Sequence, residues 1–212
     1  MIDLNIYFST NQDESKTDFF PLMSNEDEEK IGKESTPNTL AILPLKNTVL
    51  FPGVIIPITI GRDKSIKLIN DSESSNNKIG VLSQKDPHIE IPTTKDLNQI
   101  GTVAQILKTL KMPDGNITAI IQGRKRFKVE SIVKEEPYIV ASVQEINDKK
   151  YQKNKASDAL ISSVRDLALK IIDESPNIPS EANIALKNIK SSSFLINFVS
   201  SNMNIDLETK QS

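Results

Sequence analysis

The 212-residue sequence contains no cysteine and only one histidine. The absence of cysteine excludes disulfide bonds, thiol catalysis and cysteine-ligated zinc, and it suits a reducing compartment. His88 follows Asp86-Pro87 in a stretch typical of a turn, and no second histidine is present to share a metal ion with it. We therefore interpret His88 as a surface-loop residue.

Long apolar runs and a strong excess of one charge are also missing. The most apolar stretch, residues 54–60, contains Pro57 and is far shorter than the roughly 20 residues that a membrane span needs. The first residues carry Asp3 but no basic residue, unlike a secretory signal. A formal net charge of −2 argues against a dedicated nucleic-acid binder. We expect a soluble, cytoplasmic protein without a membrane partner.

Sequence motifs for catalysis are lacking. The chain has neither the phosphate-binding pattern Gly-x-x-x-x-Gly-Lys-Ser/Thr nor the nucleophile pattern Gly-x-Ser-x-Gly. Ser75-Asn-Asn-Lys78 matches Ser-x-x-Lys only formally, because no helix follows to present the serine. No pair of carboxylates stands in an apolar setting that would raise one pKa. The sequence predicts no catalytic residue, no metal site and no bound cofactor in this chain.

The first of three segments, residues 1–38, is acidic and polar. It shows little periodicity and too few apolar residues to offset the entropy of ordering, so we predict a flexible tail. The apolar motif Phe19-Phe20-Pro21-Leu22-Met23 is the exception. It is interpreted either as part of that tail or as a short docking motif.

The second segment, residues 39–147, has the pattern of short strands. Runs at 40–45, 54–60 and 79–83 are apolar, and residues 62–69 form one short helical pattern after Gly61. Residues 101–112 and 117–122 flank Pro113-Asp114-Gly115-Asn116, which predicts a hairpin, and further strands are expected at 127–133 and 138–146. The predicted fold is α+β, with a β-rich pseudo-barrel and one early helix.

The third segment, residues 148–212, is predicted to be helical. Leu160, Val164, Leu167 and Ile171 recur on one helical stripe, and Ser175-Pro176 ends that helix. A second helix is expected from the cap Ser180 to Lys190, and a third over residues 193–202. Asp206-Leu-Glu can open another helix. We expect a helical subdomain that is incomplete at its C-terminal end.

The basic cluster Arg124-Lys-Arg-Phe-Lys128 permits two interpretations. One is an ordinary strand with a solvated charged face. The other is a nucleic-acid contact, which needs stacking aromatic residues and a wider basic surface. Aromatic residues are only 5% of the chain, which favours the ordinary strand.

A second charged cluster, Arg62-Asp63-Lys64, stands where the early helix begins. Asp63 suits the positive end of a helix dipole. The cluster is either a solvated first turn or a contact surface for substrate or another subunit.

The stretch Leu43-Pro-Leu-Lys-Asn-Thr-Val-Leu-Phe-Pro-Gly-Val-Ile-Ile-Pro-Ile-Thr-Ile-Gly-Arg-Asp-Lys-Ser65 resembles the opening of the amino-terminal domain of Lon-type ATP-dependent proteases. Later pieces agree in order and spacing: Gln84-Lys-Asp-Pro87, Ile100-Gly-Thr-Val-Ala104, Leu110-Lys-Met-Pro-Asp-Gly115, Gly123 and Pro137-Tyr138. Asn47, Thr48 and Asp63 depart from the family pattern, and the acidic front is not part of the shared core.

The resemblance implies a PUA-like barrel followed by a helical bundle, placed before ATPase and Ser-Lys protease modules whose motifs this chain lacks. It also implies unfolded or tagged protein substrates, a homo-hexamer, and ATP with magnesium bound only by the ATPase module. No catalytic residue can be transferred. Two alternatives are a free-standing domain with a fixed protein partner and a PUA-like nucleic-acid binder. For a substrate site, we expect a cleft between the barrel and the helices.

Overall fold

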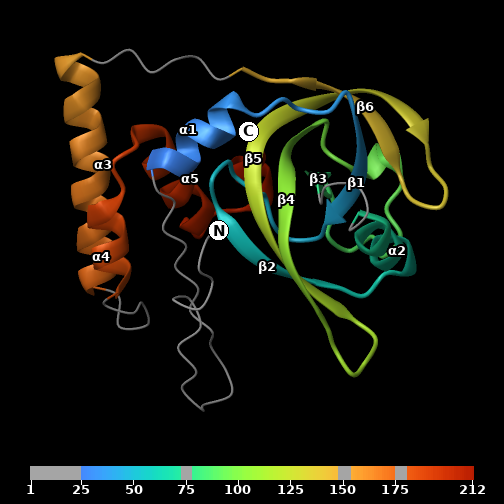
Figure 1. The fold of residues 1–212 in the computed structure, drawn as a ribbon. Helices are drawn as coiled ribbons and strands as arrows, with labels where there is room; N and C mark the ends of the chain where they lie inside the picture. The colour runs from blue at the N-terminus through green and yellow to red at the C-terminus, as the bar shows by residue number, and fades with distance from the viewer. Residues whose placement is uncertain (1–24, 73–77, 148–153, 175–180) are drawn as a thin grey trace.

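The computed structural model describes residues 25–72, 78–147, 154–174 and 181–212. Within these residues a mixed six-stranded sheet nearly closes into a ring, and a helical region lies on one side of it (Figure 1). This confirms the predicted α+β fold. The strands are β1 (Thr39–Leu45), β2 (Ile55–Ile60), β3 (Lys78–Ser83), β4 (Ile100–Lys111), β5 (Ile117–Lys134) and β6 (Val140–Glu145). The helices are α1 (Asn25–Lys33), α2 (Asp63–Ser72), α3 (Lys155–Glu174), α4 (Glu181–Asn188), α5 (Ser192–Asn202) and α6 (Leu207–Gln211).

The long strand β5 closes the ring. The sheet order is β2-β5-β4-β3-β1-β6, and β6 pairs again with β5. Among the described strands, only β1 and β3 run parallel. The first part of β5 pairs with β2 and β4, and its last part pairs with β6. The prediction of separate strands at 117–122 and 127–133 was wrong. Gly123 between them does not break the strand but admits the backbone of Phe51, whose oxygen would lie 2.2 Å from an added Cβ.

The hairpin between β4 and β5 confirms the predicted turn. Gly115 has a φ of 87°, a conformation that residues with a Cβ rarely adopt. The carboxylate of Asp114 accepts hydrogen bonds from the backbone and the side chain of Asn116, at 3.0 and 2.7 Å. Local chemistry therefore sets this turn, as expected for an Asp-Gly sequence.

Two apolar clusters fill the barrel. Leu68 and Ile69 of α2 are buried against one cluster, in which β-strand residues such as Leu43 and Ile121 take part. The other surrounds Phe127, whose side chain is fully buried. The helix α2 therefore covers one end of the barrel, and its first turn remains at the surface.

The helical region docks on the segment that precedes β2. Val54 is buried against Leu186 and Phe194, with Phe51 packed beside them. Asn197 donates a hydrogen bond from Nδ2 to the backbone oxygen of Pro52 at 3.1 Å. Residues 51–54 are therefore the apolar contact between the barrel and helices α4 and α5.

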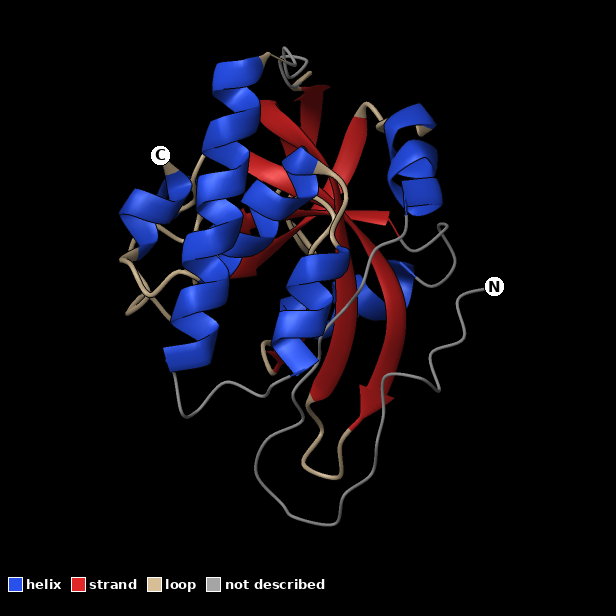
Figure 2. Cartoon of the chain, turned by 90° about the vertical axis from the view of Figure 1, so that its left-hand side faces the viewer, coloured by secondary structure: helices blue, strands red, loops and turns tan. Residues whose placement is uncertain are grey.

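The helix α3 exists where it was predicted, but it packs through a different face. Figure 2 looks onto the side of the molecule on which α3 lies. Leu160, Leu167 and Ile171 of the predicted stripe are exposed by 68%, 61% and 61%. A third apolar cluster surrounds Val54, Leu186 and Phe194, and the residues of α3 that contact it are Ile161, Ala168, Leu169 and Ile172. Both faces of α3 are apolar, so periodicity identified the helix without selecting its buried side.

The later helices agree with the sequence pattern where the structure describes them. The Ser191 hydroxyl caps α5 by accepting a hydrogen bond from the Phe194 N–H at 3.1 Å. Asp206 caps α6 in the same way, through the Thr209 N–H at 2.8 Å. The predicted signals at Ser175-Pro176 and Ser180 lie outside the described residues. None of the helices in the described ranges combines the length and the apolar character that a membrane span requires.

The segment that was predicted to be a flexible acidic tail contains regular structure within residues 25–38. Helix α1 lies there, and the side chain of Ile31 is only 7% exposed. The carboxylate of Glu34 pairs with Lys78 at 3.0 Å and with Arg124 at 3.4 Å. Glu34 thus meets two cations of the barrel, a pairing that composition alone does not reveal. Residues 1–24, including the motif at 19–23, lie outside the described part of the chain.

Candidate functional site

A cleft of about 550 Å³ opens beside the first turn of α2. Three surface segments meet around it: residues 61–65 at the start of α2, residues 90–94 after β3, and residues 135–139 between β5 and β6. These segments lie far apart in the sequence, and closure of the barrel brings them together. The apolar side chains that line the cleft are Ile42, Pro44, Leu68, Ile91, Pro92, Tyr138 and Ile139.

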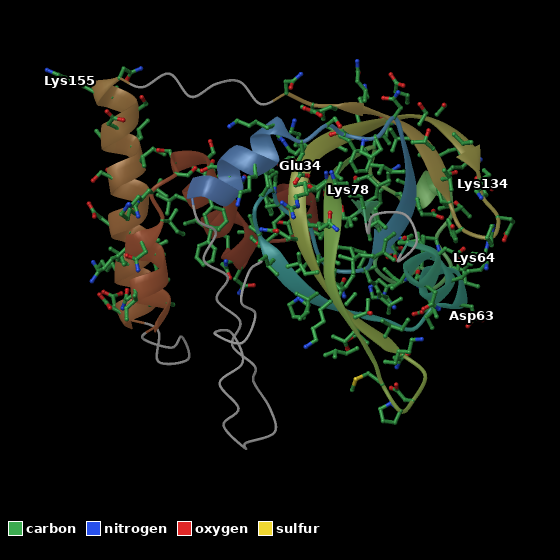
Figure 3. The ribbon with its side chains drawn as sticks, viewed as in Figure 1. Glu34, Asp63, Lys64, Lys78, Lys134 and Lys155 are labelled. Atoms are coloured by element: carbon green, nitrogen blue, oxygen red, sulfur yellow. The ribbon has the colours of Figure 1, made fainter. Side chains whose placement is uncertain are left out.

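The three charged residues singled out from the sequence all line this cleft. Asp63 begins α2, where its negative charge favours the positive end of the helix dipole. Arg62 donates a hydrogen bond from Nη2 to Oε1 of Gln84 at 2.7 Å. The ammonium group of Lys64 pairs with the Glu136 carboxylate across the cleft rim. Figure 3 shows Asp63 and Lys64 together at the start of α2, across the barrel from Lys155 of α3.

Hydrogen bonds within the chain shape the segment after β3. Gln84 is fully buried, and its Nε2 donates to the backbone oxygens of Asp86 at 3.2 Å and Ile89 at 2.9 Å. Asp96 accepts from the hydroxyl and the backbone N–H of Thr93, both at 2.7 Å, and these bonds lower the pKa of its carboxyl. His88 is exposed in this segment, which confirms its placement in a surface loop.

The charges on the cleft rim largely compensate one another. Lys46 pairs with Glu90 at 2.6 Å, and this hydrogen-bonded ion pair lowers the pKa of the Glu90 carboxyl. The carboxylate of Glu135 accepts a hydrogen bond from the Thr94 hydroxyl at 3.2 Å. Among the lining residues, carboxylates nevertheless outnumber cations: Asp63, Glu90, Glu135 and Glu136 against Arg62 and Lys64.

Tyr138 forms a partly polar wall of the cleft. Burial raises the pKa of its hydroxyl, and a hydrogen bond with Asp71 raises it further. The ammonium group of Lys134 lies 5.5 Å from the centre of the Tyr138 ring. Within the described residues, no three His, Cys, Asp or Glu side chains are grouped so that they could hold a metal ion. An apolar floor with a mostly neutralised rim suits binding of an apolar polypeptide segment.

The basic cluster at 124–128 is partly neutralised. Besides the contact of Arg124 with Glu34, Lys125 pairs with Glu145 at 2.9 Å. Lys78 of the formal Ser-x-x-Lys pattern is the other partner of Glu34, and Ser75 lies outside the described residues. These cations therefore hold the segment that follows α1 to the barrel and link β5 to β6 within it.

The boundary between barrel and helices, where a cleft was expected, is filled by the packing around Val54. A smaller hollow of about 490 Å³ lies where α6 meets the barrel, and Leu207 is its only apolar lining residue. The apolar cleft is instead formed within the β-rich part. Sequence reasoning found Arg62, Asp63 and Lys64 but missed the segments 90–94 and 135–139. The one available signal was the apolar pair Ile91-Pro92 within a polar stretch.

A small barrel with helices on one side and an apolar cleft on the other defines an α+β binding domain. Residues 39–212 match the family model described as the ATP-dependent protease La (LON) substrate-binding domain. The chain therefore belongs to the Lon protease family, and it is the non-catalytic substrate-binding domain of that family. This confirms the resemblance noted in the sequence.

Individual relatives agree with that assignment. The Lon protease of Flavobacterium johnsoniae is 54% identical over 204 residues, which cover 96% of this chain and 25% of the relative. The Lon protease of Cytophaga hutchinsonii is 44% identical over 200 residues, again covering 25% of its length. The chain thus spans about a quarter of these relatives, whose catalytic modules fall outside the matched region.

One solved structure supports the fold independently of close sequence similarity. The N-terminal domain of the Mycobacterium avium complex Lon protease superposes with a TM-score of 0.65. The alignment covers 82% of this chain and 87% of that structure at 16% identity. At this identity the comparison establishes the shared fold alone.

Proposed function

We propose that this chain captures exposed apolar segments of unfolded or tagged proteins for a Lon protease, and that the cleft beside α2 receives them. The observation that carries the proposal is the apolar lining of the cleft, which includes Ile91, 77% exposed. Exposed apolar surface of this kind is costly in water and commonly marks an interaction site. The description of the matching family model as a substrate-binding domain supports the same function.

In this proposal, the remaining steps belong to other parts of a longer protease. ATP and magnesium would be bound by an ATPase module, peptide bonds would be cleaved by a Ser-Lys protease module, and the setting would be cytoplasmic degradation of misfolded and regulatory proteins. A single cleft binds an unfolded chain weakly, because few contacts must offset the ordering of the chain. Several copies in a homo-oligomer, a hexamer by family resemblance, would bind one substrate more tightly through effective concentration.

A free-standing domain with a fixed protein partner is a second possibility. The sequence of the gene beyond Ser212 distinguishes the two: an open reading frame that continues into a phosphate-binding loop selects the protease. Nucleic-acid binding is disfavoured by the ion pairs of Arg124 and Lys125 and by the acidic excess on the cleft rim. Binding of RNA that is lost on Arg124→Glu would favour the nucleic-acid alternative.

The test is titration of the full 212-residue chain with one protein in its unfolded form and in its folded form. We expect weak binding to the unfolded form and none to the folded form. Ile139→Asp places a carboxylate in the cleft and should abolish binding, because burying an unpaired charge is costly. Ile184→Asp adds the same charge on the exposed face of α4 and should leave binding unchanged, and an unchanged circular dichroism spectrum of Ile139→Asp must show that this half-buried site still folds. Equal binding to both forms would contradict the proposal.

A further inference from the structure

We propose that residues 85–96, here called the lip loop, form a fixed apolar lip of the cleft, with Ile91 as the side chain that anchors a bound segment. Gln84 and Arg62 act as positioning residues that hold the lip loop in place. This inference rests on the proposed function. It names the residues on which the specificity of the cleft for its substrate depends. It concerns contact with an extended apolar segment of an unfolded polypeptide.

The neck of the lip loop is closed by backbone hydrogen bonds. The N–H of Lys85 donates to the oxygen of Asp96 at 2.8 Å, and the N–H of Gln84 donates to the oxygen of Leu45 at 2.8 Å. Gln84 and Leu97 also form an antiparallel bridge. The loop therefore leaves and re-enters the barrel at one fixed place.

The side chain of Gln84 links this neck to the cleft. Its oxygen accepts from Arg62, and its amide group donates to the oxygens of Asp86 and Ile89. All three bonds are made by a side chain with no exposed surface. Buried amide groups with satisfied partners hold a unique geometry, because any other arrangement leaves a polar group unpaired.

These bonds hold the loop that carries Ile91, whose apolar side chain is exposed to solvent. Ile91 is 77% exposed, more than any other large apolar residue identified as exposed in the described part of the chain, and it lines the cleft together with Pro92. A preorganised loop loses little entropy when it binds, so its contacts contribute more to affinity. Burial of most of an isoleucine side chain raises affinity roughly 10-fold or more.

The charges around the cleft indicate which segments fit. Four lining carboxylates face two lining cations, and Lys46 neutralises Glu90 from outside the lining, so the rim keeps a small negative excess that disfavours an acidic segment or a nucleic acid. In a segment that fits, aliphatic and aromatic residues contact the apolar lining, and neighbouring basic residues contact the carboxylates of the rim. The probe that follows is a short peptide of Leu, Val and Phe flanked by lysines, with a glycine–serine peptide carrying the same lysines as its control.

The experiment measures binding of both peptides to the 212-residue chain and three variants. Ile91→Ser should weaken binding of the apolar peptide roughly 10-fold. Leu160→Ser, at a similarly exposed position on α3, should change it by less than about 2-fold. Gln84→Glu keeps an acceptor for Arg62 but loses both donors to the lip loop, so it should also weaken binding several-fold. The glycine–serine peptide should bind to none of them.

A double variant separates positioning from general stability. If Gln84 acts through Ile91, then Gln84→Glu should have almost no further effect in the Ile91→Ser background. Amide exchange at Ile89 should speed up in Gln84→Glu, while exchange at Ala104 of β4 should stay unchanged. An equal loss in both backgrounds would overturn the positioning role.

The remaining outcomes also decide the matter. Unchanged binding by Ile91→Ser, with binding lost in Ile139→Asp, would overturn the anchor role and leave the proposed function intact. Equal losses of peptide binding in Ile91→Ser and Leu160→Ser would show that the peptide adheres to any exposed apolar side chain, and would also overturn the anchor role of Ile91. A wild-type chain that binds neither the apolar peptide nor an unfolded protein would overturn the proposed function itself.

Discussion

At the scale of single residues, Gly123 and Gly32 differ in the space around them. A Cβ at Gly123 would lie 2.2 Å from the oxygen of Phe51, whereas nothing lies within 4 Å of one at Gly32 in α1. Gly123→Ala should lower the free energy of unfolding by about 1–3 kcal/mol, because the backbone must shift. Gly32→Ala should raise it by about 0.5 kcal/mol through helix propensity. Urea denaturation of both variants checks this, and similar effects at the two sites would contradict it.

Asp96 makes the lip loop sensitive to acid. Hydrogen bonds from Thr93 lower the pKa of its carboxyl below the ordinary 3.8, so the ionised form is favoured in the folded chain. The resulting stabilisation of the loop is present above pH 3.8 and is lost as the pH falls through the lowered pKa. In an NMR titration, the Thr93 amide signal should therefore shift with a midpoint below 3.8. Asp96→Asn should remove this transition; a midpoint above 3.8 in the wild type would contradict the prediction.

At the scale of elements, α3 shows what periodicity predicts and what it leaves open. Leu167 belongs to the exposed stripe and Leu169 to the packed face. Leu169→Ala should cost about 1–2 kcal/mol of unfolding free energy, since this half-buried side chain packs against the third cluster. Leu167→Ala should change that free energy by less than about 0.5 kcal/mol. Thermal and urea unfolding measure both, and a larger effect of Leu167→Ala would show that α3 packs by its predicted stripe.

The elements of the barrel were largely predictable from the sequence. Short apolar runs ended by Pro and Gly gave the strands, and Asp114-Gly115 gave the hairpin, because these signals act over a few residues. The unbroken β5 was missed, since the role of Gly123 depends on Phe51, which is distant in the sequence. The candidate site follows the same division: Arg62 to Lys64 belong to a local motif, but the segments that complete the cleft meet only in space.

At the scale of the whole molecule, α1 ties the barrel to the helical region. Glu34 holds Lys78 and Arg124 of the barrel, and Glu28 accepts a hydrogen bond from the Ser191 hydroxyl at the start of α5. Figure 3 shows Glu34 and Lys78 close together where α1 meets the sheet. The segment before the family match is therefore part of the folded unit from residue 25 onward.

This arrangement predicts unequal effects for two ion pairs. Glu34→Ala removes the partner of two cations whose side chains are only 17% and 15% exposed, and should lower the unfolding free energy by about 1–2 kcal/mol. Glu136→Ala breaks the exposed pair with Lys64 and should cost less than about 0.5 kcal/mol. Urea denaturation at low and high salt compares them. Equal, salt-sensitive losses of unfolding free energy in the two variants would show that the ion pairs of Glu34 stabilise the fold no more than an exposed surface pair does.

The sequence by itself determined the family, the α+β class, the local turns and caps, and the position of most strands and helices. These features depend on residues a few positions apart, whose spacing and conformational preferences are visible in one dimension. Only the tertiary structure decided which face of α3 packs, how α1 joins the barrel, and that residues 61–65, 90–94 and 135–139 enclose one cleft. Those outcomes depend on which distant surfaces exclude water together and which buried charges find partners, and neither is set until the barrel closes.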